Sequence, residues 1–189
     1  MTNMSRSRIK GYRIYLIGFM GAGKTTLGKR LANKIGFNFF DIDDLIETEE
    51  NRSINDIFLE KGAEHFRKLE RKVLNQTNFK QKVVYATGGG TPFFFDNMQW
   101  MNKNGTTIYV RHTEDLLFGR LRSSKSNRPL ISKLSDEELR RFIIDHLVQR
   151  EKFYNQSKVI VDGKGIKVQN VVEKLIIPKK FSKLDLQLK

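Results

Sequence analysis

The sequence predicts an α/β domain with a mainly parallel five-stranded sheet covered by helices. Five short apolar runs that favour strands alternate with longer amphipathic stretches that favour helices. A glycine-rich loop pattern separates the first predicted strand from the first predicted helix. Polar or glycine-rich residues also follow the second and third predicted strands. Because ligands bind at the carboxyl ends of strands in such sheets, we expect one site where these three segments meet.

In the first half of the chain, three apolar runs predict strands. They lie at residues 12–17, 37–40 and 83–86. The second run is interpreted as a buried strand, because its aromatic residues do not alternate regularly with polar ones. Helices are expected at 24–35, ending at Gly36, around Leu45 and Ile46, and from the cap residue Ser53 to about residue 75, with an interruption at Gly62.

The second half continues the alternation. Strands are expected at 106–110 and 159–161, and helices at 94–103, 113–122, 135–154 and 167–177, the last ending before Pro178. Residues 123–133 are polar and predict a flexible segment between two helices. The sequence shows no internal repeat and no second domain.

The composition fits one globular domain of 189 residues, with 39% hydrophobic residues. No apolar run approaches the roughly 20 residues that cross a membrane, and no secretory signal is visible. The absence of cysteine excludes disulfides and thiolate metal sites. We expect a cytoplasmic monomer with a single domain over 12–177, a disordered lead over 1–11 and a basic tail over 178–189.

The formal net charge of +14 raises the possibility of a nucleic-acid partner. However, the basic residues are spread along the chain and mixed with acidic ones, and no nucleic-acid-binding motif is present. We interpret the charge as a basic solvated surface that suits small anionic substrates, and we expect neither a nucleic-acid nor a membrane partner.

The run from Gly18 to Thr25 matches the phosphate-loop pattern G-x-x-x-x-G-K-[ST] at every fixed position. Glycines let successive backbone N–H groups point into one concavity, and the following helix adds the positive end of its dipole. Lys24 is expected to reach the β- and γ-phosphates of a nucleotide, and the hydroxyl of Thr25 to bind Mg²⁺.

Acidic residues follow the second predicted strand. Asp41 and Asp43 are two positions apart, so one carboxylate can assist a Mg²⁺ ion through water while the other orients an acceptor hydroxyl. Taken alone, the pair equally fits ordinary acidic residues at a helix N-terminus.

Glycine and arginine residues supply the remaining candidates. The triplet Gly88-Gly89-Gly90 either allows close approach to a substrate or forms a plain turn. Arg67, with Glu70 three residues later, either forms a buried anion receptor or a solvated helix pair. Arg128 lies in the polar segment, where a closing lid would bring it to a phosphate, and Arg150 offers a second anion clamp.

Together these segments resemble shikimate kinase over about residues 12–177. The similarity rests on the phosphate loop and on the following ordered set: Phe40-Asp41-Ile42-Asp43, Phe66-Arg67-Lys68-Leu69-Glu70, Thr87-Gly88-Gly89-Gly90, Arg128-Pro129-Leu130, and Arg150 with Tyr154. The resemblance implies a P-loop NTPase fold of the nucleoside-monophosphate-kinase type, with three α/β/α layers and a mobile lid at about 122–134. It also implies ATP-dependent phosphorylation of the 3-hydroxyl of shikimate in chorismate and aromatic amino acid biosynthesis.

The resemblance assigns roles to these residues. Lys24, Asp43 and Arg128 would be catalytic, with Asp43 acting as a base or only as an orienting group. The ATP-binding residues would be Gly21, Ala22, Gly23, Lys24, Thr25, Thr26, Arg120 and Arg128. The shikimate-binding residues would be Asp43, Arg67, Gly88, Gly89, Gly90 and Arg150. Mg²⁺ would be held by Thr25 and, through water, by Asp41.

The sequence departs from the family pattern at three places. Lys152 occupies the position of the proline in Arg-x-Pro-x-Tyr, the stretch from Arg120 to Arg128 is one residue longer, and the loop at 162–165 lacks an arginine. The longer stretch leaves Arg122 as an alternative to Arg120 for stacking on adenine. Two other functions remain to be weighed: a related kinase for gluconate or a nucleoside monophosphate, and a non-catalytic binding protein.

Overall fold

The computed structural model describes residues 12–77, 82–124 and 130–175. Its centre is a five-stranded sheet in the order β2-β3-β1-β4-β5, in which every neighbouring pair is parallel. The strands are β1 (Arg13–Ile17), β2 (Asn38–Asp41), β3 (Val83–Ala86), β4 (Thr106–Arg111) and β5 (Val159–Asp162). The predicted parallel five-stranded sheet is therefore confirmed.

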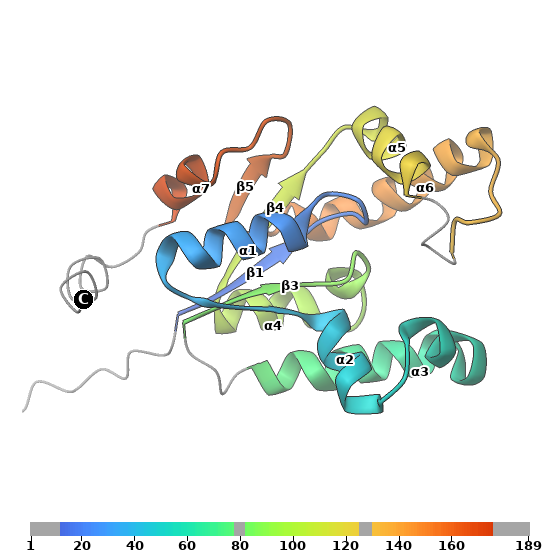
Figure 1. The fold of residues 1–189 in the computed structure, drawn as a ribbon, viewed down its shortest axis with the longest axis horizontal. Coiled ribbons are helices and arrows are strands. Elements are labelled where there is room, and N and C mark those ends of the chain that lie inside the picture. The colour runs from blue at the N-terminus through green and yellow to red at the C-terminus, as the bar shows by residue number, and fades with distance from the viewer. Residues whose placement is uncertain (1–11, 78–81, 125–129, 176–189) are drawn as a thin grey trace, which may run out of the picture.

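Helices cover both faces of the sheet (Figure 1). They are α1 (Lys24–Ile35), α2 (Ile42–Glu50), α3 (Ile54–Gln76), the 3₁₀ turn η2 (Thr91–Phe93), α4 (Asn97–Asn104), α5 (Glu114–Ser123), α6 (Asp136–Tyr154) and α7 (Val168–Lys174). The predicted helices are all present, with ends that differ by a few residues. The resulting three layers confirm the predicted fold class.

Side chains of the central strand alternate between two hydrophobic cores. Ile14 and Leu16 point to the core formed with α1, α5 and α7, whereas Tyr15 and Ile17 point to the core formed with α3 and α4. A strand that is buried on both faces reads as a continuous apolar run, which explains the sequence of β1. Because all five strands run the same way, their carboxyl ends meet at one edge (Figure 1).

The prediction that residues 37–40 form a buried strand was wrong. β2 is an edge strand that pairs only with β3, and its residues are exposed or half-buried. Its aromatic residues cover neighbouring elements instead: Phe39 lies against Gly28 of α1, and Phe40 stacks on Tyr85 of β3. An edge strand can therefore carry consecutive aromatic residues that pack on neighbouring elements without being fully buried.

Local signals set the ends of the helices. Gly36 ends α1 in the left-handed conformation, with φ of 70°. The Ser53 side chain accepts a hydrogen bond from the backbone N–H of Asp56 at the start of α3. Gly62 interrupts α3 with φ of 77° and ψ of 173°, as the sequence predicted.

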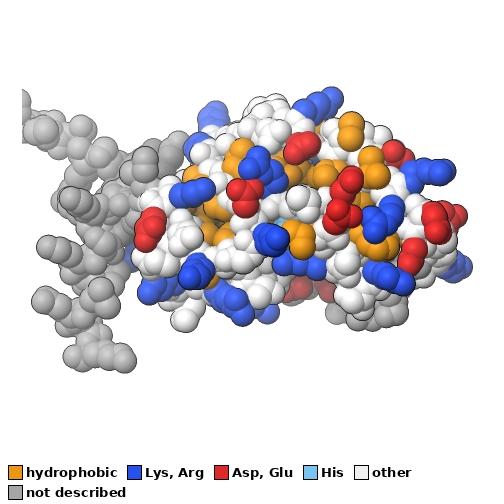
Figure 2. Space-filling model, turned by 90° about the horizontal axis from the view of Figure 1, so that it is seen from above, with side chains coloured by type: hydrophobic (Ala, Val, Ile, Leu, Met, Phe, Trp, Pro, Cys, Tyr) orange, Lys and Arg blue, Asp and Glu red, His pale blue; other side chains and the backbone are white. Residues whose placement is uncertain are grey.

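Parts of three predictions lie outside the described residues. These are the lead at 1–11, the tail at 178–189, and residues 125–129 of the lid expected at about 122–134. Within the described ranges, no helix is long and apolar enough to span a bilayer. Figure 2 shows basic side chains scattered among acidic ones on the face it presents, which fits the expectation of a mixed charged surface.

Two glycines provide a test of this packing. A Cβ at Gly105 would lie 2.5 Å from the backbone oxygen of Arg13 and 2.7 Å from the ring of buried Tyr15. Gly105→Ala should therefore lower the free energy of unfolding by roughly 1–3 kcal/mol. A Cβ at Gly119, in the exposed part of α5, meets nothing within 4 Å, so Gly119→Ala should raise it by about 0.5–1 kcal/mol.

Urea unfolding of the two variants beside the natural chain measures both effects. Equal stability of the two alanine variants would contradict the packing described at the junction of α4 and β4.

Candidate active site

Three adjoining cavities lie along the carboxyl edge of the sheet. The outer cavity (about 420 Å³) borders α1 and the segment between β5 and α7, and the loop cavity (about 430 Å³) contains the phosphate loop. The acidic cavity (about 350 Å³) lies against α2 and α3. The outer and loop cavities share Gly21, Gly23, Thr26 and Arg120, and the loop and acidic cavities share Met20, Asp43, Gly88 and Gly89. The three spaces therefore form one continuous cleft.

The phosphate loop has the backbone of an anion site. Gly21 and Gly23 have φ of 76° and 83°, a left-handed conformation that side chains disfavour. α1 begins at Lys24 with no side-chain cap from Gly23, so its first N–H groups remain available to an anion. The Lys24 ammonium is nearly buried and donates to the carbonyl oxygens of Gly18 and Phe19, at 2.8 and 2.9 Å.

Thr25 and Asp41 lie together at the floor of the loop cavity. The Thr25 hydroxyl donates to Asp41 Oδ2 at 2.8 Å, while Asp41 Oδ1 accepts from the backbone N–H of Asp43 at 3.2 Å. Hydroxyl and carboxylate oxygens suit Mg²⁺. Within the described ranges no three acidic or histidine residues cluster as a cage. A cation held here would therefore rely on water and ligand oxygens for most of its coordination.

Asp43 is the most perturbed carboxylate of the cleft. Burial, then the nearby carboxylates of Asp41 and Glu70, raises its pKa to about 7, against the opposing effect of Lys24 and Arg67. Its Oδ1 is buried and has no hydrogen-bond partner among the described residues. A buried acceptor without a partner is unfavourable by about 1–3 kcal/mol, so the site favours a ligand that donates a hydrogen bond here.

Arg67 is held beside this carboxylate by a fully buried partner. Its Nη1 donates to Glu70 Oε2 at 2.7 Å, and Glu70 is completely excluded from solvent. The guanidinium also lies over the ring of Phe94, at 4.3 Å from the centroid. Its Nε is buried with no partner in the described part of the chain. The pair is thus largely buried, rather than a solvated helix pair.

The glycine triplet leaves space that side chains would fill. A Cβ at Gly88 would lie 2.7 Å from Glu70 Oε1, and one at Gly90 would lie 3.0 Å from Arg67 Nη2. The hydroxyl of buried Tyr154 donates to the carbonyl oxygen of Gly89 at 2.5 Å. The segment therefore packs closely on both charged groups and is more than a plain turn.

Arg150 lies on α6 and lines the acidic cavity, as does Arg67. Its guanidinium is 5.5 Å from the ring centroid of Phe19. α6 continues without a break through Lys152, which occupies the position of the family's proline, to Tyr154.

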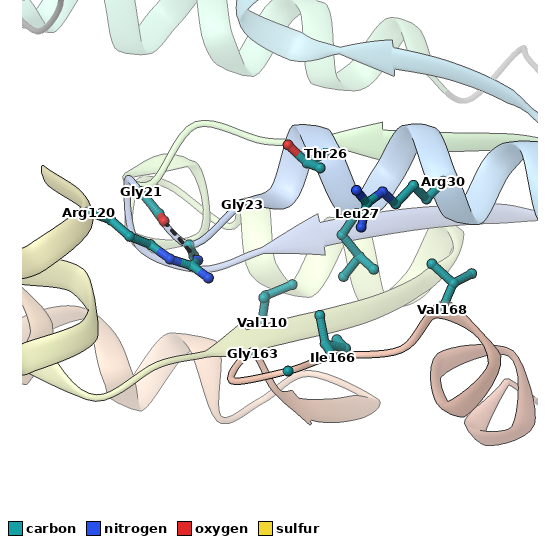
Figure 3. A pocket seen from close by; sticks show the side chains of 12 residues that line it. Gly21, Gly23, Thr26, Leu27, Arg30, Val110, Arg120, Gly163, Ile166 and Val168 are labelled. Carbon is teal, nitrogen blue, oxygen red and sulfur yellow. Dashed lines mark hydrogen bonds between the residues drawn. The ribbon is translucent and has the colours of Figure 1, made fainter. Parts of the chain in front are cut away.

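Of the two arginines considered for adenine, only Arg120 borders the described cleft. Its Nη1 donates to the carbonyl oxygen of Gly21 at 3.3 Å (Figure 3). Arg122 is mostly exposed and pairs with Asp136 at 3.0 Å. Figure 3 shows Arg120 at one end of the outer cavity and Arg30, Ile166 and Val168 toward the other.

Some site residues were not predicted from the sequence, and one prediction has no structural placement. Arg128 lies outside the described residues. The cleft also contains residues that lie outside the motifs, namely Asp44, Glu47 and Phe58 in the acidic cavity, and Arg30, Val110, Ile166 and Val168 in the outer cavity. Glu70 was noticed only as a partner for Arg67, and its complete burial has no signal in the sequence.

Comparison with known proteins identifies the family. The family model for shikimate kinase matches residues 20–178. A shikimate kinase of Azobacteroides pseudotrichonymphae is 46% identical over 165 residues, covering 87% of this chain and 97% of the relative.

Solved structures agree. The shikimate kinase of Bacteroides thetaiotaomicron superposes with a TM-score of 0.82 at 40% identity, over 86% of this chain and 97% of the other. That of Acinetobacter baumannii, solved in complex with shikimate, gives 0.77 at 32% identity, over 92% and 95%.

A gluconokinase of Sinorhizobium meliloti shares the fold alone, since its TM-score is 0.53 at 13% identity, over 87% of this chain and 89% of the other. With a matching family model over most of its length and close relatives covered almost completely, the chain belongs to the shikimate kinase family.

Proposed function

We propose that this chain transfers the γ-phosphoryl group of ATP to the 3-hydroxyl of shikimate, giving shikimate 3-phosphate and ADP. One observation carries the proposal. A phosphate loop opens directly into a cavity where a carboxylate oxygen of Asp43 and the Nε–H of Arg67 are both buried, with no partner among the described residues. A small acid that carries hydroxyl groups offers a donor to the first and an anion to the second.

The nucleotide would occupy the outer and loop cavities. Its base fits the outer cavity, beside Arg120 and the apolar side chains of Val110 and Ile166. Its phosphates fit the loop cavity, where backbone N–H groups from Gly21 to Thr26 and the Lys24 ammonium meet negative charge. Mg²⁺, when bound by Thr25 and through water by Asp41, would neutralise phosphate charge. Arg128 is proposed to add a further positive charge from the lid.

Shikimate would occupy the acidic cavity. Arg67 from α3 and Arg150 from α6 both line this cavity and would bind the carboxylate of shikimate. The carboxylate of Asp43 would accept a hydrogen bond from the reacting hydroxyl, and the triplet Gly88 to Gly90 would line the remaining side. A Cβ at Gly88 would collide with Glu70, and one at Gly90 would crowd Arg67.

The reaction needs positioning and charge stabilisation more than covalent chemistry. The 3-hydroxyl oxygen forms the new P–O bond as the bond to the bridging oxygen of ADP breaks, and the hydroxyl proton passes to Asp43. A carboxylate whose pKa is near 7 is suited to accept that proton at neutral pH. Lys24 would compensate negative charge on the transferring group. We propose that the chain acts as a monomer, as one domain over residues 12–177.

The acceptor panel tests the proposal. ADP release should be strong with ATP, Mg²⁺ and shikimate, and near background with gluconate or nucleoside monophosphates. Nucleoside monophosphates carry no carboxylate, and gluconate is a flexible open chain that loses more conformational freedom on binding than the ring of shikimate. Asp43→Asn should reduce the turnover number by at least about a hundredfold, the size of a general-base effect. Release with gluconate instead would leave the fold intact and reject the substrate.

Arg67 gives a second prediction. Arg67→Lys keeps a positive charge beside Glu70 but loses the Nε donor and the planar fork. The KM for shikimate should rise roughly tenfold to a hundredfold, corresponding to a charged hydrogen bond of about 1.5–3 kcal/mol. The KM for ATP should hardly change. Arg71→Lys, on the same helix but paired with Asp96 at 2.6 Å, is the matched control. An equal change of both KM values in Arg67→Lys would contradict the assignment.

Asp43 gives a prediction on stability. Its pKa in the folded state lies above the ordinary value of 3.8, so the folded state holds a proton between pH 4 and 7 that the unfolded chain releases. The contribution of protonated Asp43 to the free energy of unfolding is therefore fully present below about pH 4 and is lost as the pH rises through about 7. Asp43→Asn should be more stable than the natural chain by roughly 2–4 kcal/mol above pH 7, with the difference developing between pH 4 and 7.

Unfolding free energies measured across this pH range check the prediction. Asp145→Asn, at an exposed position on α6, should change stability by less than about 0.5 kcal/mol and serves as control. A difference for Asp43→Asn that does not vary with pH would show that burial does not perturb this carboxylate.

A further inference from the structure

His112 is a buried histidine behind the phosphate loop that has no role in the reaction described above. It follows β4 at the carboxyl edge of the sheet and is only 7% exposed. Its Nε2 lies 3.0 Å from the carbonyl oxygen of Ala22 and 3.1 Å from Nη1 of Arg120. It therefore contacts both the phosphate loop and the arginine that borders the outer cavity.

The surroundings select one tautomer of the neutral ring. Nδ1 is buried and has no partner in the part of the chain that the structure describes. A proton on Nδ1 would be a buried donor without an acceptor, which is more unfavourable than an unpaired acceptor nitrogen. The proton therefore belongs on Nε2, which donates to the Ala22 carbonyl, so the approach of Arg120 Nη1 to Nε2 at 3.1 Å is a packing contact and not a hydrogen bond. Arg120 then donates to the neighbouring carbonyl, that of Gly21, at 3.3 Å.

The ring also sets the position of the opposite wall of the outer cavity. A Cβ at Gly163 would overlap the imidazole of His112, so this segment approaches the ring as closely as a glycine permits. The backbone N–H of Gly163 is held at 2.7 Å from the carbonyl oxygen of Arg111. Figure 3 shows Gly163 and Arg120 on the outer cavity, together with Gly21 of the loop. Gly163 and Arg120 contact the His112 imidazole, and Gly21 precedes Ala22, whose carbonyl oxygen contacts the same ring.

We propose that His112 is a positioning residue for the nucleotide: its imidazole fixes the Ala22 carbonyl and keeps Arg120 and Gly163 at the spacing that accepts the base. The inference rests on the nucleotide site assigned under the proposed function. His112 touches neither the shikimate-binding side chains nor the reacting atoms in this arrangement. Its loss should therefore weaken nucleotide binding and leave turnover at saturating ATP nearly unchanged.

Protonation of His112 would disturb this arrangement. The charged groups that face it are Arg120 from α5, Lys24 from α1 and Asp162 from β5, and the cavity on its other side is bordered by Arg111, Asp115, Glu151 and Lys164. Burial, and then Arg120, lowers the pKa of His112, while the Ala22 carbonyl and Asp162 oppose this shift. The ring is thus neutral at pH 7. Acidification would place an N–H without a partner on Nδ1 and a charge beside Arg120.

The test is direct ADP binding, measured by calorimetry with Mg²⁺, at about pH 8 and about pH 5. The lower pH lies well below 6.5 because burial and Arg120 lower the pKa of His112 from that ordinary value. His112→Gln keeps an N–H donor near the position of Nε2 and does not titrate, whereas His112→Leu removes the donor at similar size. At the higher pH, His112→Gln should bind ADP within about threefold of the natural chain, and His112→Leu roughly tenfold more weakly, the value of one net hydrogen bond. The natural chain should lose more affinity for ADP on acidification than His112→Gln, because only the natural chain has the titrating imidazole. The titration of ADP itself affects both proteins equally.

Kinetics separate this role from a structural one. In His112→Leu the KM for ATP should rise, while kcat and the KM for shikimate stay within about threefold. Equal ADP affinity in the natural chain and His112→Leu, or no advantage of Gln over Leu, would overturn the inference.

Should His112→Leu not fold, the pH dependence of the natural chain against His112→Gln decides the question alone, and identical dependence would overturn the inference. Absence of ADP binding by the natural chain would instead reject the nucleotide site, and this inference with it.

Discussion

The carboxylate of Glu70 contacts or influences most of the groups that line the acidic cavity. It is completely buried, accepts a hydrogen bond from Arg67 at 2.7 Å, and accepts another from the Thr91 hydroxyl. It lies so close to Gly88 that a side chain there would collide with it, and it helps to raise the pKa of Asp43. A buried charge is retained only when it is paired. Glu70 therefore fixes the arginine, the glycine segment and the proton affinity of Asp43 together.

The parallel sheet explains why these groups meet. Asp41 ends β2, the glycine triplet follows β3, and the phosphate loop follows β1, and these three strands are neighbours in the sheet. Helix α3 then brings Arg67 and Glu70 to the same edge, and α6 brings Arg150 and Tyr154. The arrangement places like charges near one another and leaves polar atoms of Asp43 and Arg67 without a partner in the described part of the chain. Such local instability is typical of sites prepared for a ligand.

Much of this could be predicted from the sequence, because the informative signals are local. The phosphate loop is a contiguous pattern, and the alternation of strands and helices fixes the direction of the sheet. Gly62, Ser53 and Gly36 act on their own neighbours and were assigned correctly. The sequence does not predict the order of the strands. The strand expected to be buried at 37–40 is the edge strand β2.

The remaining site residues depend on tertiary contacts that no spacing encodes. Nothing in the sequence around His112 indicates that its imidazole meets Ala22, 90 residues earlier. The burial of Glu70 likewise follows from packing between α3 and the segment after β3. The choice between Arg120 and Arg122 required the direction of each side chain on α5.

The most direct test of the central claim is the titration of the Asp43 carboxyl carbon by NMR, in the natural chain and in Glu70→Gln. The Asp43 carboxyl group should titrate with a midpoint of about 7 in the natural chain. In Glu70→Gln the midpoint should be lower, because one neighbouring negative charge is removed, yet above the ordinary value, because burial is the larger cause. An ordinary aspartate midpoint in both proteins would contradict the claim that Glu70 and burial together prepare Asp43 for its substrate.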